Sequence, residues 1–198
     1  DRELADRPRQ QETVRKILAG VRSLDGIVSD VLAFARPEGV DRGWTDLGVL
    51  FEQTVALVQP ELVARDVRVV VDPSAETVKL HADFRQLGRA LLNLLINAAQ
   101  ACQSGGMVWV TAGHPGDGTV QIDIADNGPG LKPEVLDKLF NPFFTTKPTG
   151  VGLGLAIVHR IVEEHGGTIQ AFNRPQGGAV FRMRLPLSEP TAHGKREE

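Results

Sequence analysis

Several features that mark common protein classes are missing from the sequence. It contains one cysteine, Cys102, and no tyrosine. A single cysteine excludes an internal disulfide and fits a reducing compartment, so we expect a cytoplasmic location, even if the parent protein is membrane-anchored. No uninterrupted apolar run reaches the roughly 18–20 residues that a membrane-spanning helix needs. The first ten residues, DRELADRPRQ, are too polar for a secretory signal.

An excess of charge is also absent. The sequence has 22 Lys and Arg against 25 Asp and Glu, which gives a formal net charge of −3. This balance argues against non-specific nucleic-acid binding as the main task. A hydrophobic content of 41% and a charged content of 24% are ordinary for a globular protein. With 198 residues, we expect one domain, or one domain with an appendage.

The appendage is predicted to be one long helix over residues 10–35, ended by Pro37. Two interpretations are open: a helix packed on its own domain, or a coiled-coil or bundle helix with partners outside this chain. The heptad-like spacing and the separating sequence Arg-Pro-Glu-Gly favour the second. The apolar residues that form one stripe by 3-4 spacing are Val14, Ile17, Leu18, Val21, Leu24, Val28, Val31 and Ala35.

The rest of the chain is predicted to mix helices and strands. After a loop with Trp44, Asp46 is predicted to cap a helix through Leu57 or Val58. The pattern predicts an α/β (α+β) two-layer sandwich, with one mixed sheet and helices on one face. The tail, residues 188–198, is predicted to be disordered. Further helices are expected over residues 83–102, 133–139 and 152–165, and strands over residues 67–72, 107–112, 119–125, 168–172 and 179–185.

The helix predicted over residues 83–102 carries polar amides among apolar neighbours. Asn93 and Asn97 are four residues apart and share a face, which Gln100 could extend. An unpaired amide in apolar surroundings costs about 1–3 kcal/mol, so these groups need partners. They are either hydrogen-bonded amides of the core or a polar stripe that faces a ligand, with a carbonyl oxygen on a hard cation such as Mg²⁺.

Two glycine-rich turns lie further along, at residues 126–130 (DNGPG) and 150–154 (GVGLG). Glycine lets the backbone approach a ligand closely. The second turn runs into a predicted helix, and a helix N-terminus favours an anion, typically phosphate. Asp126 ends an alternating strand, so its carboxylate is predicted at the rim of the sheet. We interpret the two turns as a nucleotide site, with Asp126 on the base and the second turn near the phosphates.

The order of these motifs resembles the catalytic ATP-binding domain of bacterial sensor histidine kinases, closest in style to the nitrogen-regulation type. LLNLLINAAQA is similar to the N box, DNGPG to the first glycine box, FNPFFTTK to the F box and GVGLGL to the second glycine box. The resemblance covers about residues 47–186 and implies the Bergerat fold of the GHKL superfamily, shared with gyrase, chaperone and mismatch-repair ATPases. VSDVLAFARP resembles the second helix of the dimerisation and phosphoacceptor hairpin.

The resemblance implies ATP and Mg²⁺ as ligands and assigns the site residues. Asn97 would bind the metal, Asn93 would lie near the phosphates, and both would be the catalytic residues. Asp126 would accept from the adenine amino group. Phe144 with Phe143 would anchor a lid, although a core role is the alternative, and Lys147 would reach a phosphate or stay exposed. The other residues expected around the nucleotide are Gln100, Gly128, Gly130, Thr145, Thr146, Gly150, Gly152, Leu153 and Gly154.

The same resemblance divides the chain into the hairpin helix (residues 1–37), the catalytic domain (38–187) and the tail (188–198). One departure is that no histidine precedes His81, whereas the family's phosphoacceptor lies on the first hairpin helix. We therefore expect transfer of the ATP γ-phosphoryl group to a histidine supplied elsewhere, then relay to an aspartate of a response regulator. The parent protein would be a homodimer through the N-terminal helix.

Two rival functions are open beside the kinase. The first is a nucleotide-binding interaction module without kinase activity. The second is a hydrolytic ATPase of the same fold, which the lack of an acidic general base at the Asn93 position disfavours.

Overall fold

A computed structural model of the chain describes residues 10–14, 17, 20–21, 39–147 and 150–187. It divides into two compact units, Asp1–Glu38 and Gly39–Glu198. In the first unit the described residues are helical, and Val14, Ile17 and Val21 are exposed. The rest of the long helix predicted over residues 10–35, and the predicted disordered tail, lie outside the described residues.

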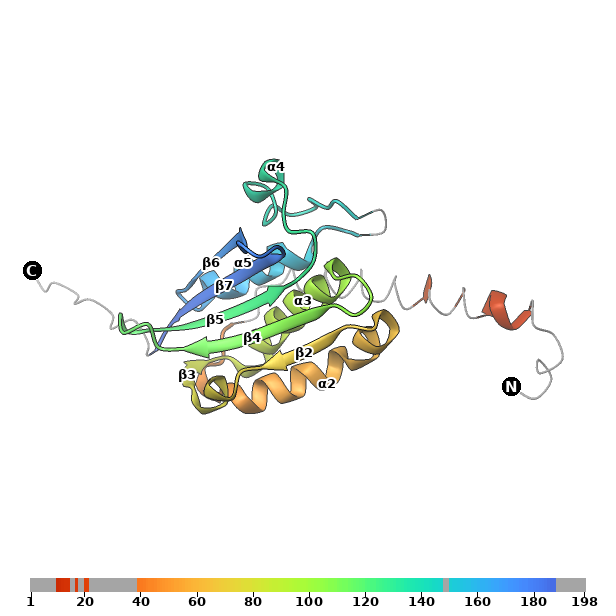
Figure 1. The fold of residues 1–198 in the computed structure, drawn as a ribbon. Helices are drawn as coiled ribbons and strands as arrows, with labels where there is room; N and C mark the ends of the chain where they lie inside the picture. The colour runs from red at the N-terminus through yellow and green to blue at the C-terminus, as the bar shows by residue number, and fades with distance from the viewer. Residues whose placement is uncertain (1–9, 15–16, 18–19, 22–38, 148–149, 188–198) are drawn as a thin grey trace, which may run out of the picture. The chain divides into compact units, whose positions relative to one another are not determined.

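The second unit is built on a mixed five-stranded sheet in the order β2-β4-β5-β7-β6 (Figure 1). β2 runs parallel to β4, while β4–β5, β5–β7 and β7–β6 are antiparallel. All five predicted strands agree with the structure to within one residue at each end. The strands are β2 (Arg68–Val71), β4 (Met107–Gly113), β5 (Thr119–Asp126), β6 (Thr168–Asn173) and β7 (Ala179–Pro186).

Three helices cover one face of this sheet: α2 (Leu47–Arg65), α3 (Phe84–Ala101) and α5 (Gly154–Glu164) (Figure 1). α3 packs against both α2 and α5. Alternate residues of β5 are buried, namely Val120, Ile122 and Ile124, because β-strand side chains point to opposite faces in turn. The predicted sandwich with helices on one face is confirmed.

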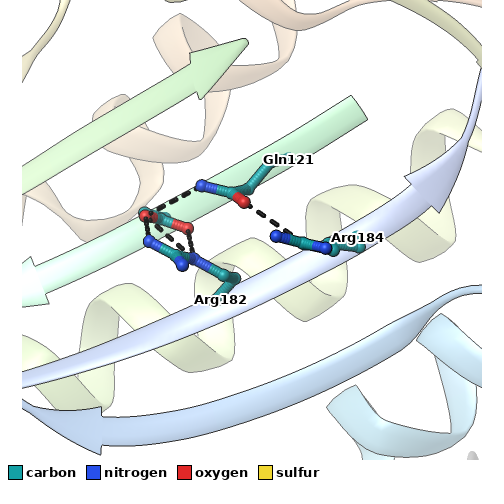
Figure 2. A network of polar contacts seen from close by, with 4 residues as sticks. Gln121, Arg182 and Arg184 are labelled. Carbon is teal, nitrogen blue, oxygen red and sulfur yellow. Dashed lines mark hydrogen bonds and ion pairs between the residues drawn. The ribbon is translucent and has the colours of Figure 1, made fainter. Parts of the chain in front are cut away.

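The opposite face of the sheet is polar where β5 pairs with β7 (Figure 2). Asp123 lies across from Arg182, whose Nε and Nη2 donate to the carboxylate at 2.9 and 2.7 Å. On the neighbouring pair, Arg184 Nε donates to Gln121 Oε1 at 3.3 Å. These polar side chains bond to one another across the two strands, and the hydrophobic core lies on the helix-covered face.

α2 begins as predicted but ends much later. Asp46 accepts from Gly48 N at 3.0 Å, as a capping aspartate should. The predicted end at Leu57 or Val58 is wrong, since the helix continues through Pro60 to Arg65. Burial of Leu62 offsets the backbone hydrogen bond that Pro60 cannot make. The helix ends at Asp66, whose left-handed φ of 55° turns the chain.

Other differences concern short elements. Trp44 was predicted in a loop but lies in β1 (Gly43–Asp46), which pairs with β3 (Lys79–Ala82). Strands of only four residues give too weak a signal to predict. The short helix α4 (Pro133–Leu136) stops before the predicted end at residue 139, and a 3-10 turn (Pro73–Thr77) was not predicted.

α5 begins at Gly154, two residues later than predicted. Gly152 has a φ of +74°, which a right-handed helix cannot include, so it belongs to the preceding turn. At the other end Gly166, with a φ of +72°, stops the helix as predicted.

Among the described helices, α2 is long and apolar enough to cross a membrane, judged by length and composition alone. A core helix of a folded domain satisfies the same criterion. Here Leu50, Phe51 and Leu62 of α2 are buried, and the helix packs against α3.

Candidate nucleotide-binding site

Asp126 is the last residue of β5 and is almost wholly buried. Its Oδ1 accepts from Gly128 N at 2.8 Å and from Ala179 N at 3.2 Å. Burial raises the pKa of this carboxyl group and outweighs the two backbone donors and the nearby Arg174 charge. Because both backbone bonds end on Oδ1, Oδ2 is the acceptor that remains for a ligand amine.

The loop that follows Asp126 lies tightly against its surroundings. A Cβ added at Gly128 would stand 2.7 Å from the carbonyl oxygen of Ala101, at the end of α3. A Cβ at Gly130, where φ is +77°, would stand 2.7 Å from Asn173 Oδ1. Both positions therefore require glycine, and the loop keeps a fixed course beside the buried carboxylate.

The polar face of α3 lies half-buried among leucines, as the sequence predicts. Asn93 Nδ2 donates to the carbonyl of Arg89 at 3.0 Å, and its Oδ1 lies toward Gly154 at the start of α5. Asn97 Oδ1 and Gln100 Oε1 both accept from the Lys147 ammonium, at 2.7 and 2.5 Å. Lys147 is exposed as a residue, and partial burial of its ammonium lowers its pKa. The structure thus brings Asn97, Gln100 and Lys147 together.

The ammonium shows that two amide oxygens of α3 converge on one positive charge. Mg²⁺ accepts amide and carbonyl oxygens together with waters and substrate phosphates, so Asn97 and Gln100 fit a site of that kind. Within the described residues, no group of three or more His, Cys, Asp and Glu side chains could hold a metal. A metal held by carboxylates or imidazoles alone therefore does not match this part of the chain.

The second glycine turn brings the N-terminus of α5 onto this face of α3. A Cβ at Gly154, the first residue of α5, would stand 2.9 Å from Asn93 Oδ1. The N-cap residue Leu153 makes no side-chain capping bond, and within the described residues the first N–H groups of α5 are therefore available to an anion. Leu153 is buried at 1% exposure, so only its backbone can face a ligand.

In the segment between α4 and α5, Phe143 and Gly152 are held together by backbone contacts. Phe143 N donates to the carbonyl of Gly152 at 2.9 Å, and a Cβ at Gly152 would meet Phe143 C at 2.5 Å. Phe143 is 66% exposed, so it has no core role, whereas Phe144 is half-buried. Further along, Thr145 Oγ1 accepts from Lys147 N at 3.0 Å. Thr146 and Gly150 are exposed.

The sequence did not reveal a second set of residues, in β6 and the β6–β7 turn, which hold the first glycine loop (residues 126–131). Asn173 bonds to both backbone groups of Leu131, and Arg174 Nη1 donates to the carbonyl of Asp126 at 2.9 Å. Gly178, with a φ of +90°, lies directly against that carbonyl. The Gly177-Gly178 pair between two predicted strands was the available signal of a close backbone approach.

His165 is a structural residue. It is buried, its Nε2 accepts from Asp83 N at 3.0 Å, and its Nδ1 lies 2.7 Å from the carbonyl of Ile161. Nε2 therefore joins the end of α5 to the start of α3, while Nδ1 contacts a carbonyl within α5 itself.

The chain is similar to known proteins in sequence and in structure. Residues 82–189 match the family of histidine kinase-, DNA gyrase B-, and HSP90-like ATPases. The chain is 38% identical over 165 residues to the sensor histidine kinase ZraS of Escherichia coli K12, covering 83% of this chain and 35% of ZraS.

Two solved structures are also similar. The catalytic domain of the histidine kinase ThkA has a TM-score of 0.69 and 30% identity, covering 75% of this chain and 97% of that one. The structure of ThkA in complex with the response regulator protein TrrA has a TM-score of 0.76 and 26% identity, covering 93% of this chain and 53% of that one.

The chain therefore belongs to the histidine kinase-, DNA gyrase B-, and HSP90-like ATPase family. Within that family its relatives are sensor histidine kinases of two-component systems, and it is their ATP-binding catalytic domain. The chain spans about a third of the length of the curated relatives that it matches (35% of ZraS and 30% of AtoS).

Proposed function

We propose that this domain transfers the γ-phosphoryl group of bound ATP to a histidine nitrogen on a separate helix, as the first step of a two-component relay. The observation that carries the proposal is the convergence on one side of α3. There, two amide oxygens meet a cation, and the uncapped start of α5 lies beside Asn93. Such an arrangement binds and orients a triphosphate, and most of phosphoryl-transfer catalysis is positioning and charge stabilisation.

In the proposed complex the adenine ring lies along the first glycine loop, and its exocyclic amine donates to Asp126 Oδ2. The triphosphate extends toward the N-terminus of α5, where the backbone N–H groups at Gly152 and Gly154 bind its oxygens. Asn93 would lie beside these phosphates. Thr145, Thr146 and Gly150 would border them, and Lys147 would leave the amide oxygens for a terminal phosphate.

The proposed reaction moves the γ-phosphoryl group from ATP to the histidine, and every bond formed is matched by a bond broken. The histidine nitrogen attacks the γ-phosphorus, a new N–P bond forms, and the bond to the β–γ bridging oxygen breaks. ADP leaves with that oxygen, and the phosphohistidine then serves as donor to an aspartate. Mg²⁺ would be held by Asn97, with Gln100 nearby, and would supply charge neutralisation for the phosphates.

Several further features belong to the same proposal. Residues 1–37 would be the second helix of a dimerisation hairpin, residues 38–187 the catalytic domain and residues 188–198 a tail. The parent protein would be a homodimer through this helix. Its partner would be a response regulator, in line with the complex of ThkA with TrrA, and the domain would work in the cytoplasm.

The test is phosphotransfer in trans. The chain is mixed with a histidine-bearing helical hairpin from a sensor kinase, labelled ATP and Mg²⁺, and label on the hairpin is measured. Asn97→Ala should lower the transfer rate at least about a hundredfold, because electrostatic groups at such sites contribute on the order of 10²–10³ in rate. Its Mg²⁺-dependent ATP binding should weaken more than its Mg²⁺-free binding.

A matched control is Gln53→Ala, an exposed polar residue of α2, which should behave as the wild type. Tight ATP binding by the wild type without any transfer would instead favour the interaction module. An Asn97→Ala variant that binds Mg-ATP and transfers phosphate normally would contradict the assignment of the metal site.

A further inference from the structure

The first glycine loop is held at both ends by two adjacent residues of β6 and the turn that follows. At its start, Asp126, the backbone carbonyl accepts from Arg174 Nη1 at 2.9 Å. At its end, Leu131, the backbone N–H donates to Asn173 Oδ1 at 2.7 Å, and the backbone carbonyl accepts from Asn173 Nδ2 at 2.8 Å. Neither residue belongs to the motifs by which the site was identified.

Asn173 matches the loop because an amide offers one acceptor and one donor on the same side chain. It therefore pairs with the N–H and C=O of Leu131 as a neighbouring strand would. The same oxygen stands 2.7 Å from the position of a Cβ at Gly130, so the glycine and the amide depend on each other.

Arg174 is itself fixed in place. Its guanidinium lies 4.3 Å from the centre of the Trp109 ring, on β4, in a cation–π contact. Its backbone N–H donates to the carbonyl of Gly178 at 2.9 Å, which closes the β6–β7 turn. Ala179, just beyond, donates to Asp126 Oδ1. The turn thus controls both the position of the loop and one oxygen of the carboxylate.

We propose that Asn173 and Arg174 are positioning residues for base recognition: they set the course of residues 126–131 and thereby the adenine preference of the site. They act through Asp126, Gly130 and Leu131 and need no contact with the nucleotide. This inference rests on the proposed nucleotide site. It adds that base selectivity depends on the β6–β7 turn, which lies far along the chain from the glycine box.

The experiment compares Asn173→Ala and Asn173→Asp with the full chain as wild type. The aspartate is nearly isosteric and keeps the acceptor for Leu131 N, but it turns a second oxygen toward the Leu131 carbonyl. Calorimetry measures Kd for ADP and for GDP, and hydrogen exchange by NMR follows the Leu131 amide. Gln170→Ala, an exposed residue of β6, is the matched control.

Both Asn173 variants should bind ADP about three- to tenfold more weakly, the range expected for one or two lost hydrogen bonds. GDP affinity should change less, so the preference for adenine falls. The Leu131 amide should exchange faster in Asn173→Ala, while Gln170→Ala matches the wild type. A purely structural role would instead lower ADP and GDP affinity equally or shift only the urea midpoint.

The inference is overturned if folded Asn173→Ala and Asn173→Asp keep the wild-type ratio of ADP to GDP affinity. Arg174→Met provides a second measurement, and an unchanged ratio there would overturn its part. A wild-type chain that binds no adenine nucleotide would instead overturn the proposed nucleotide site, and the two failures are therefore distinguishable.

Discussion

At the scale of single residues, the site depends on a carboxylate whose two oxygens have different surroundings. Oδ1 of Asp126 is committed to the backbone of Gly128 and Ala179. Burial makes ionisation harder, so the pKa of Asp126 lies above its ordinary value of 3.8. Because Oδ1 already accepts from two backbone N–H groups, a proton would go to Oδ2 and turn the remaining acceptor into a donor, which connects nucleotide affinity to pH.

We predict that ADP affinity falls on acidification, starting at a higher pH than an ordinary aspartate would cause. Below the raised pKa the carboxyl group binds a proton, and affinity should fall toward tenfold per pH unit as that proton competes with the ligand. Calorimetry from neutral to acidic pH checks this. The ADP phosphates titrate in the same way whichever protein binds them, so Asp126→Asn is the control. Its ADP affinity should lack the part of the pH dependence that is due to Asp126. Parallel pH profiles for both proteins would contradict the prediction.

The sequence revealed individual site residues where a motif marked them, and it missed those without one. Asn93, Asn97 and Gln100 were found because polar amides on an apolar helix need partners. Asn173 and Arg174 were missed because their role depends on contacts with a loop, 42 residues away in the chain for Asn173, which the pairing of β5 with β7 brings near. Nothing in local spacing reports such a contact.

At the scale of elements, the N-terminal cap of α3 fixes the position of that helix and of its polar face. Asp83 caps it by accepting from Arg85 N and Gln86 N at 3.0 and 3.1 Å, and it also accepts from Asp41 N at 3.0 Å. Burial alone would raise the pKa of Asp83, but these backbone donors outweigh it and lower the pKa below 3.8. The ionised cap therefore stabilises the fold.

We predict that Asp83→Ala lowers the free energy of unfolding by about 1–2 kcal/mol at neutral pH, as the loss of a helix cap does. Because the folded-state pKa is lowered, this contribution is complete above the unfolded value and is lost as the pH falls through the folded value. Urea unfolding at pH 7 and in acid measures the difference. Glu52→Ala, at an exposed position of α2, is the control and should cost little. A constant difference at every pH would contradict the role of the charge.

Element boundaries were predictable where chemistry fixed them. Asp46 and Asp83 start their helices, and Gly166 stops α5, as capping and glycine rules require. The end of α2 was mispredicted because burial of Leu62 overrides the local effect of Pro60. β1 and β3 were missed because their pairing joins segments about 36 residues apart, which short patterns do not show.

At the scale of the whole molecule, the catalytic unit is accompanied by a helical segment with exposed apolar side chains. Val14, Ile17 and Val21 are 40%, 60% and 56% exposed, and their spacing places them on one stripe. Such a stripe favours association with a like helix. This supports the proposed dimerisation role of the N-terminal segment.

We predict that the chain self-associates and that Ile17→Lys weakens this association at least about tenfold, because a charge would have to be buried in an apolar contact. Sedimentation over a range of protein concentrations measures the change. Thr13→Lys is the control. It adds the same charge outside the apolar stripe, three residues before Lys16 in the sequence, and should have a smaller effect. Monomeric behaviour of the wild type at high concentration would contradict the prediction.

The contact of the Arg174 guanidinium with the Trp109 ring also makes the intrinsic fluorescence of the protein a means of following ligand binding. The chain has two tryptophans and no tyrosine, so its near-ultraviolet emission comes from Trp44 and Trp109. Trp44 is 73% exposed on β1, whereas the cation on Trp109 is hydrogen-bonded to the backbone of Asp126. Replacing Trp44 by phenylalanine would leave a single emitter beside the adenine loop. Ligand entry could then be followed by intrinsic fluorescence in a rapid-mixing instrument, without an attached dye.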